Sequence, residues 1–390
     1  MDKERTYVLA VNGGSSSLKF GLYETGSLTR ELSGLVQRIG DGEGHFEIQD
    51  AGNKVLADIR KSYPDSGAAT RELIDWLKER SSRYPIAAIG HRIVQGGLGH
   101  REPELITKDL IQSLEKIIEL APNHLPSELE TIRAFGEAFV HATQVACYDT
   151  AFHREMPEYA RSYPIPRIGR EEGLIRYGFH GLSYEYIMQE LDNKGGERVI
   201  IAHLGNGCSM AAVHAGRGID TTMGLTPTGG LVMGTRTGDL DPGLVLYLLL
   251  QKKIPAEELE QILTKQSGLK ALSGGISDVQ ELLAKETTDP NAALALTVFC
   301  YQAKKFIGSL SAALGGLDTL VFTGGIGEHA AVIRQRICEG LQFLGIDIDT
   351  ALNEAGVAII SPASGRVSVR VIPTNEELMI ARHTDKLWRS

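Results

Sequence analysis

The stretch YVLAVNGGSSSLK, residues 7–19, joins an apolar run to a turn rich in glycine and serine. Two later stretches repeat the pattern: VIIAHLGNGCS at residues 199–209 and LVFTGGIGE at residues 320–328. An apolar run that ends in glycine and hydroxyl residues is typical of a strand entering a tight turn. Glycine lets the backbone approach a ligand closely, and successive N–H groups bind anions. Three such turns therefore predict several loops that converge on a polyphosphate.

The composition is that of an ordinary soluble globular protein, with 390 residues, 42% of them hydrophobic and 23% charged. A net charge of −9 argues against nucleic acid or an anionic membrane as the main partner. It does not exclude an anionic substrate, because a few arginines can make one pocket positive. Residues 1–5 lead directly into an expected strand, so we expect no signal peptide, and the longest apolar run, residues 244–250, is too short to span a bilayer.

The four cysteines are widely spaced and form no C-x-x-C pair; they are Cys147, Cys208, Cys300 and Cys338. This usage favours free thiols in a reducing compartment over disulfides or zinc ligands. We therefore expect a cytoplasmic protein.

Strand-like and helix-like segments alternate along the whole chain, which predicts an α/β fold. The length favours two domains, and a restart of the pattern places them at 1–150 and 151–375, with a C-terminal helix at about 376–390 that packs back on the first. Strands are expected up to about residue 60 and at 144–148. The similar openings at 7–23 and 199–213 suggest two similar lobes.

Capping residues predict where several helices begin. Asp289 followed by Pro290 is a helix start. Ser127-x-x-Glu130 and Thr374-x-x-Glu377 are capping boxes. In the second box Glu377 would turn back to the Thr374 N–H, which leaves the Glu376 carboxylate for magnesium or another ligand. The alternative is that both glutamates only favour the helix dipole.

Two arginines lie among glycines: Arg92 in GHRIVQGG (90–97) and Arg236 in GTRTGD (234–239). An arginine in such a loop is well placed to grip a planar anion with two hydrogen bonds; the alternative is a solvated surface side chain. Neither lies in an apolar periodic segment, so we expect replacement of either to change stability little.

His180 and His124 each precede an expected helix, where a structural hydrogen bond is the alternative to a role in catalysis. Asp149 follows a strand and could equally orient another group or cap a helix. The sequence has neither a Walker A loop nor a G-x-G-x-x-G fingerprint, and no Cys/His cluster that predicts zinc.

The ordered motifs closely resemble the acetate kinase family, of the acetate and sugar kinase, chaperone ATPase and actin superfamily, from about Val8 to Arg382. The resemblance rests on residues 12–20, 90–97, 149–153, 176–181, 203–209, 224–242, 322–328 and 373–382. It implies a two-lobed actin-like ATPase fold with duplicated ribonuclease-H-like cores, ATP in the cleft, and a homodimer.

The resemblance also implies residue roles. The groups expected around the transferring phosphoryl group are Arg92, Asp149, His180 and Arg236. The substrate pocket would contain Arg92, Val94, Asn123, His124, Phe179 and Pro227. The nucleotide would contact Lys19, His203, Leu204, Gly205, Asn206, Gly207, Asp278, Val279, Gln280, Gly324, Gly325, Ile326, Gly327 and Glu328. Asn12 and Glu376 would hold Mg²⁺, with Mn²⁺ as a second choice.

The activity that this implies is reversible transfer of the ATP γ-phosphoryl group to a short-chain carboxylate, acetate first, giving acetyl phosphate and ADP. A carboxylate is already a nucleophile, so positioning and cationic donors address the main barrier. The alternatives are a propionate or butyrate kinase, and a catalytically silent actin-like nucleotide-binding protein. Arg92, His180 and Arg236 disfavour the silent protein, because nucleotide binding alone does not need them.

Three departures from the family pattern bear on specificity. Asn123 places an amide at an acyl-pocket position; a buried amide would favour a polar acid, unless Leu125 fills the pocket instead. Gln280 and His329 replace two base-side partners of the nucleotide. We therefore expect a relaxed choice among ATP, GTP and ITP.

Overall fold

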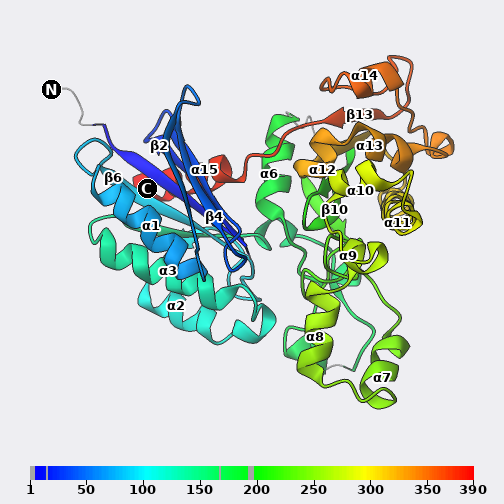
Figure 1. The fold of residues 1–390 in the computed structure, drawn as a ribbon, viewed down its shortest axis with the longest axis horizontal. Coiled ribbons are helices and arrows are strands. Elements are labelled where there is room, and N and C mark those ends of the chain that lie inside the picture. The colour runs from blue at the N-terminus through cyan, green and yellow to red at the C-terminus, as the bar shows by residue number, and fades with distance from the viewer. Residues whose placement is uncertain (1–4, 15, 167, 192–196) are drawn as a thin grey trace. The chain divides into compact units, whose positions relative to one another are not determined.

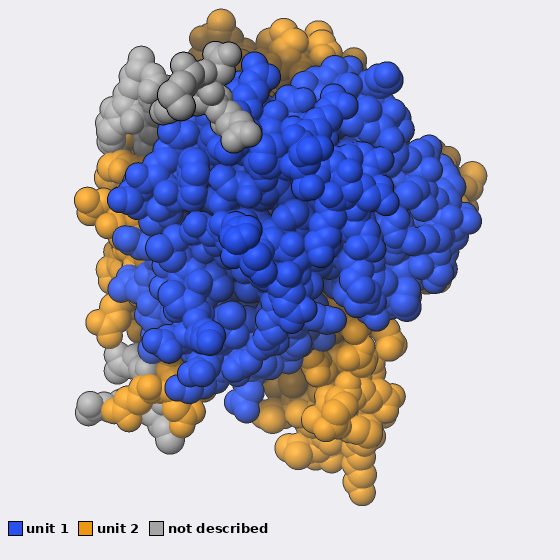
Figure 2. All heavy atoms as spheres, turned by 90° about the vertical axis from the view of Figure 1, so that its left-hand side faces the viewer, with its two compact units in different colours: residues 1–151, 181–186, 375–390 blue, residues 152–180, 187–374 orange. Residues whose placement is uncertain are grey.

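The computed structural model describes residues 5–14, 16–166, 168–191 and 197–390. The chain divides into two compact units, coloured separately in Figure 2. Unit 1 comprises Met1–Ala151, Gly181–Tyr186 and Asn375–Ser390, and unit 2 comprises Phe152–His180 and Ile187–Thr374. Ser15, in the first glycine-rich turn, lies outside the described residues.

Unit 1 contains an eight-stranded mixed sheet in the order β5-β4-β3-β2-β1-β6-β8-β7. The strands are β1 (Tyr7–Gly13), β2 (Ser17–Glu24), β3 (Arg30–Gln37), β4 (Gly44–Asp50), β5 (Val55–Lys61), β6 (Ile86–Ile93), β7 (Glu104–Leu105) and β8 (Thr143–Tyr148). The first five form an antiparallel meander, whereas β6 pairs parallel with both β1 and β8. The predicted strand-rich start of the chain is confirmed.

Helices cover both faces of this sheet (Figure 1). They are α1 (Ser66–Lys78), α2 (Lys108–Glu115), α3 (Leu125–Ala138) and α15 (Glu376–Arg389). Successive residues of a strand point to opposite faces, and β1 shows the result. Leu9 belongs to the core that includes residues of α1, whereas Val8 belongs to the core built with Met379 and Ile380 of α15. The C-terminal helix thus packs on the strands of unit 1.

Unit 2 is built on a five-stranded sheet in the order β11-β10-β9-β12-β13. Its strands are β9 (Arg198–Leu204), β10 (Cys208–His214), β11 (Arg217–Thr221), β12 (Thr319–Thr323) and β13 (Ser368–Val371). Its helices are α4 (Glu158–Arg161), α5 (Ile168–Glu171), α7 (Pro242–Leu250), α8 (Ala256–Lys265), α9 (Gly268–Ser273), α10 (Val279–Lys285), α11 (Pro290–Leu314), α12 (Gly324–His329), α13 (Ala331–Cys338) and α14 (Thr350–Glu354). Residues of α6 (Gly181–Glu190) belong to both units.

The two units repeat one arrangement of strands. In unit 1, β1 pairs antiparallel with β2 and parallel with β6. In unit 2, β9 pairs antiparallel with β10 and parallel with β12. Each of the two openings that look alike in the sequence is therefore a hairpin whose first strand has a parallel neighbour. Among the described residues, no helix is long and apolar enough to span a membrane.

The predicted start of α11 is confirmed, because Asp289 is its N-cap and accepts a hydrogen bond from the Asn291 N–H. The capping box at Ser127 is wrong. α3 begins earlier, at Leu125, and the Ser127 hydroxyl donates to the His124 carbonyl at 2.9 Å. Pro126 explains the difference, because a residue without an N–H is well tolerated in the first turn of a helix.

Candidate active site

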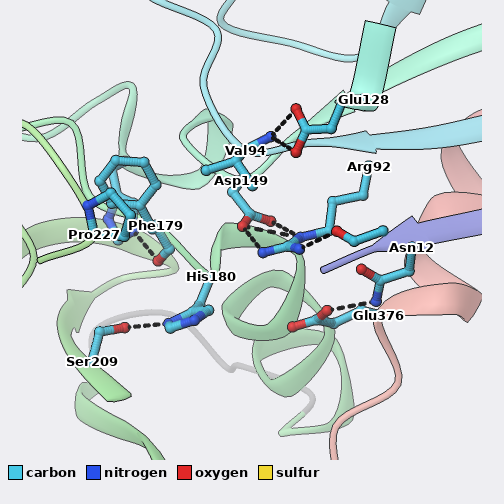
Figure 3. Close-up of polar contacts among 12 residues, drawn as sticks. Asn12, Arg92, Val94, Glu128, Asp149, Phe179, His180, Ser209, Pro227 and Glu376 are labelled. Atoms are coloured by element: carbon cyan, nitrogen blue, oxygen red, sulfur yellow. Dashed lines mark hydrogen bonds and ion pairs between the residues drawn. The ribbon is translucent and has the colours of Figure 1, made fainter. Parts of the chain in front are cut away.

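A buried ion pair lies at one edge of the unit 1 sheet. Arg92 is near the end of β6 and Asp149 directly follows β8, and parallel neighbours end at the same edge. The Arg92 Nε lies 3.1 Å from each Asp149 oxygen, and Nη2 lies 2.5 Å from Oδ2 (Figure 3). The Arg92 Nη1 donates to the Gly13 carbonyl at 2.9 Å. Asp149 therefore orients an arginine, one of the two roles that the sequence left open.

The electrostatics of this pair follow from its burial. The side chain of Asp149 is 1% exposed and that of Arg92 is 13% exposed. Burial alone would lower the pKa of Arg92, but the surrounding carboxylates, Asp149 first and then Glu376, together outweigh it, and the pKa of the guanidinium is raised. The Arg92 guanidinium is therefore positively charged at neutral pH. Arg92 is thus held inside the fold by an ion pair, so we propose that its replacement lowers stability.

The end of β1 meets the start of α15 at Asn12. Its Nδ2 lies 2.8 Å from both Glu376 Oε2 and Glu377 Oε1. The predicted capping box at Thr374 is wrong: Asn375 is the N-cap and accepts from the Leu378 N–H, while the Thr374 N–H donates to Glu328. Asparagine is at least as good an N-cap as threonine, so α15 starts one residue later than the box requires. Both glutamates therefore face Asn12.

A cavity in unit 1 opens beside Arg92. Its lining residues come from β1, the β1–β2 turn, β2, the β3–β4 connection, β6, α1, the segment before α3, and α3; they are Val11, Gly13, Gly14, Ser17, Leu18, Ile39, Ser66, His91, Arg92, Asn123, His124, Ser127, Glu128 and Thr131. Asn123 is exposed, so the expectation of a buried amide is wrong. Leu125 is fully buried in the core beneath α3 rather than on the cavity wall. The cavity thus joins Arg92, Asn123 and His124, three of the predicted site residues.

Glu128, which the sequence reasoning missed, is a buried carboxyl group on the wall of this cavity. Its oxygens lie 3.2 and 3.3 Å from the backbone nitrogen of Val94, a predicted pocket residue that is itself buried (Figure 3). Burial raises the pKa of Glu128 to about 8, although Arg92 and the Val94 N–H both act to lower it. Glu128 is therefore predominantly neutral at pH 7.

In unit 2, His180 occupies the N-cap position of α6 with a left-handed backbone, φ 58°. Its Nδ1 lies 2.8 Å from Ser209 Oγ (Figure 3), and its ring stacks on that of His203 at 4.4 Å. The Arg236 Nη1 donates to the Pro227 carbonyl at 2.6 Å. The Pro227 carbonyl thus helps to hold Arg236, the predicted cation of unit 2.

Gly207 brings the second glycine-rich loop close to both groups. A Cβ at Gly207 would lie 3.0 Å from Arg236 Nη2 and 3.3 Å from His180 Nε2, so a larger residue would crowd both side chains. The loop at residues 203–207 therefore lies beside His180 and Arg236 within unit 2.

The third glycine-rich segment is adjacent to the second. Gly324 has φ +75°, and a Cβ there would lie 2.8 Å from the Leu204 carbonyl oxygen. Two of the three predicted loops therefore lie side by side. The Glu328 carboxylate accepts from the N–H groups of Gly324 and Thr374 at 2.8 and 3.1 Å, so this predicted nucleotide contact also secures the loop.

Arg334, which was not predicted from the sequence, holds the loop at residues 324–328 in place. It is 1% exposed and donates to the carbonyls of Gly327 and Glu328 and to Asn353. An isolated arginine on a helix gives no sequence signal for this role.

The remaining predicted residues are placed as follows. Lys19, on β2, is exposed, as are Asn206, Gly325 and Gln280, while Leu204, Val279 and Gly327 are buried, and His203, Gly205, Ile326 and Pro227 are partly buried. Asp278 is the N-cap of α10 and accepts from the Glu281 N–H. Phe179 is buried, and its carbonyl lies 3.1 Å from His153 Nε2.

Comparisons with known proteins agree over the whole chain. The profile of the Acetokinase family matches residues 7–382. The chain is 43% identical to proteins named acetate kinase from Rhodopseudomonas palustris (strain TIE-1) and Thermoanaerobacterium thermosaccharolyticum, with 98% of this chain covered in both cases and 98% and 99% of the relatives.

Solved structures agree with the sequence comparison. A propionate kinase from Francisella tularensis superposes with a TM-score of 0.90 at 38% identity, covering 98% of this chain and 100% of that one. The acetate kinase of Porphyromonas gingivalis gives 0.86 at 34% identity, covering 98% and 99%. The predicted α/β kinase fold is confirmed, and the chain belongs to the Acetokinase family.

Proposed function

We propose that this protein transfers the γ-phosphoryl group of ATP reversibly to a short-chain carboxylate, with acetate as the first substrate, giving acetyl phosphate and ADP. The observation that carries the proposal is the buried Arg92–Asp149 pair on the wall of a cavity next to a glycine-rich turn. A carboxylate kinase must bind an organic anion close to phosphate groups, and this arrangement supplies a fixed cation for it. Membership of the Acetokinase family supports the same reaction.

Unit 1 would bind and orient the acid. Asp149 and the Gly13 carbonyl engage three of the five N–H groups of Arg92, and two remain to bind a carboxylate. Because the guanidinium is held from two sides, little side-chain entropy is lost when the acid binds. The substrate carboxylate then attacks the γ-phosphorus without a general base, because it is already ionised.

Unit 2 would bind the nucleotide and neutralise the phosphoryl group in flight. The loops at 203–207 and 324–328 would lie against the phosphates and the adenosine. Arg236 and His180 lie against Gly207, so both would act where charge accumulates on the transferring group. Ser209 fixes the His180 ring through Nδ1.

The residues at the end of β1 fit a magnesium ion. Glu376 and Glu377 converge on Asn12, and carboxylate and amide oxygens are the ligands that Mg²⁺ prefers. Mg²⁺ is usually bound through one or two carboxylates together with substrate phosphates. Asn12 and Glu376 would hold Mg²⁺, or Mn²⁺, and the bound ion would neutralise phosphate charge.

Propionate is the second candidate substrate, because one of the similar structures is a propionate kinase. The test is formation of acyl phosphate, trapped as the hydroxamate, from ATP and each of acetate, propionate and butyrate. Acetate should give the highest kcat/KM. A clear preference for propionate or butyrate would identify that acid as the substrate in place of acetate. If none of the acids gave an acyl phosphate, the result would favour a silent nucleotide-binding protein.

We also propose that the protein is a cytoplasmic homodimer. Helix α7 has no buried residue, and Leu246, Tyr247 and Leu250 are 55%, 49% and 65% exposed, an apolar face of the kind that a second copy covers. All four cysteines are buried free thiols, which supports a reducing location. Analytical ultracentrifugation should give twice the mass of one chain. The Leu246→Asp variant should give the mass of a single chain.

A further inference from the structure

Glu128 is a buried carboxyl group to which the proposed chemistry assigns no role. It lies in the first turn of α3 and is 7% exposed. Within the described part of the chain, its hydrogen-bonding partner is the Val94 N–H, shared between both oxygens at 3.2 and 3.3 Å. One shared backbone donor is poor compensation for a buried carboxylate. The group also lines the cavity beside Arg92, so a substrate held by Arg92 would lie within its reach.

The charges around Glu128 decide which form it takes. The ionisable groups near Glu128 are Arg92 and His91 on β6, Asp149 at the end of β8, and His124 at the start of its own helix. The other residues that line the cavity are glycine, serine, threonine, asparagine and apolar residues, which carry no charge. Arg92 and Asp149 neutralise each other. Burial lowers the pKa of His91 to about 4, so His91 is neutral as well.

Ionisation of Glu128 therefore changes the charge at this wall. While Glu128 is neutral, it adds no negative charge and offers an O–H donor. When Glu128 ionises, the donor is lost and a negative charge is added, which opposes the entry of an anion. Burial raises the pKa of Glu128 to about 8, which places this change in the mildly alkaline range.

We propose that Glu128 is a substrate-binding residue whose neutral carboxyl group donates a hydrogen bond to the carboxylate held at Arg92. This inference rests on the proposed function and deepens it by naming a second group that recognises the acid. It separates acid binding from nucleotide binding, because Glu128 faces the acid cavity of unit 1.

The test is the pH dependence of KM for acetate and for ATP between pH 6.5 and 9.5, at saturating magnesium. For the unmodified protein we expect KM for acetate to rise by up to about tenfold per pH unit above pH 8, with kcat and KM for ATP changing much less. Glu128→Gln keeps an N–H donor and cannot ionise, so its KM for acetate should stay flat. Glu128→Met has no donor, so its KM should be raised at pH 7 and also flat.

Glu130→Gln is the matched control, because Glu130 is exposed on the same helix and its profile should follow that of the unmodified protein. A KM for acetate that is flat to pH 9.5 in the unmodified protein, or that rises equally in Glu128→Gln, overturns the inference. If no acid is phosphorylated, the proposed function fails separately. Calorimetric affinity for acetate at pH 7 and pH 9 then decides the role of Glu128, and equal affinities overturn it.

Discussion

The two hairpins that open units 1 and 2 have the same strand pairing, but the arginines near them are held in different ways. In unit 1, Arg92 is part of a strand and is fixed by the buried carboxylate of Asp149. In unit 2, Arg236 lies in a segment without regular structure and donates to the Pro227 carbonyl. Two cations expected to serve one reaction therefore differ in what their loss would do to the fold.

The difference has a physical cause. A buried ion pair that loses one partner leaves the other charge uncompensated, at a cost of about 3–5 kcal/mol. Arg236 is only partly buried, and loss of its hydrogen bond to the Pro227 carbonyl costs about 1–2 kcal/mol. Arg92 thus links activity to stability, whereas Arg236 contributes mainly to activity.

The largest expected effect is on turnover, and it should be similar in both units. Arg92→Ala and Arg236→Ala should each lower kcat by on the order of a thousandfold, because each removes a charge that stabilises the transferring phosphoryl group. Steady-state acyl phosphate formation measures this, with Arg71→Ala as the control, since Arg71 is 64% exposed on α1. Near-normal turnover of Arg236→Ala would remove Arg236 from the site.

The second effect is on stability, and it concerns Glu128, a buried carboxyl group of unit 1. Unfolded Glu128 loses its proton near pH 4.5, whereas the folded protein keeps it until about pH 8. Within that window the folded state binds more protons, so stability falls as pH rises, by about 1.4 kcal/mol per pH unit. Because glutamine does not ionise, the Glu128→Gln variant should not lose stability in this way as pH rises.

Urea unfolding of Glu128→Gln and the unmodified protein at pH 5 and pH 7.5 tests the effect. The variant should gain about 3 kcal/mol relative to the unmodified protein between the two pH values. A difference that does not change with pH would mean that Glu128 titrates normally in the fold.

The third effect concerns the two glutamates that face Asn12. From the capping argument, Glu377→Gln would be mild. Because Asn12 donates equally to both carboxylates, we now expect Glu376→Gln and Glu377→Gln each to lower activity at limiting magnesium by roughly tenfold. Titration of activity with MgCl₂ measures both. Full activity of Glu377→Gln at every magnesium concentration would show that only Glu376 acts on magnesium.

The smallest effect lies on the base side of the nucleotide, in unit 2. Gln280 and His329 are both exposed, and phosphate contacts carry no information about the base. We expect kcat/KM for ATP, GTP and ITP to agree within about tenfold, or 1.4 kcal/mol. A preference for ATP of about a hundredfold, or 2.7 kcal/mol, would show that other residues read the adenine.

The sequence predicted the features that depend on local pattern. Apolar runs ending in glycine marked β1, β9 and β12, and Asp289-Pro290 marked the start of α11. It was less reliable where neighbouring residues compete for one role: Asn375, and not Thr374, caps α15. Such choices depend on small energy differences that tertiary contacts decide.

Residues that act through burial were not predictable in this way. Glu128 and Arg334 lie on helices where a charged residue is ordinarily solvated, and only the packing of other segments encloses them. Asn123 shows the reverse, because an expected buried position is exposed. Burial depends on the whole fold, whereas spacing and capping depend on a few neighbours.

The most direct test of the account is a double-mutant cycle of Arg92→Ala and Asp149→Asn, followed by urea unfolding, with Arg236→Ala measured alongside. Arg92→Ala alone should cost about 3–5 kcal/mol of unfolding free energy. The double variant should cost less than the sum of the single variants by about 2 kcal/mol or more, since neither charge is left unpaired. Arg236→Ala should cost below about 2 kcal/mol. Equal losses for the two arginine variants, with additive effects in the cycle, would contradict the claim that the two units hold their cations differently.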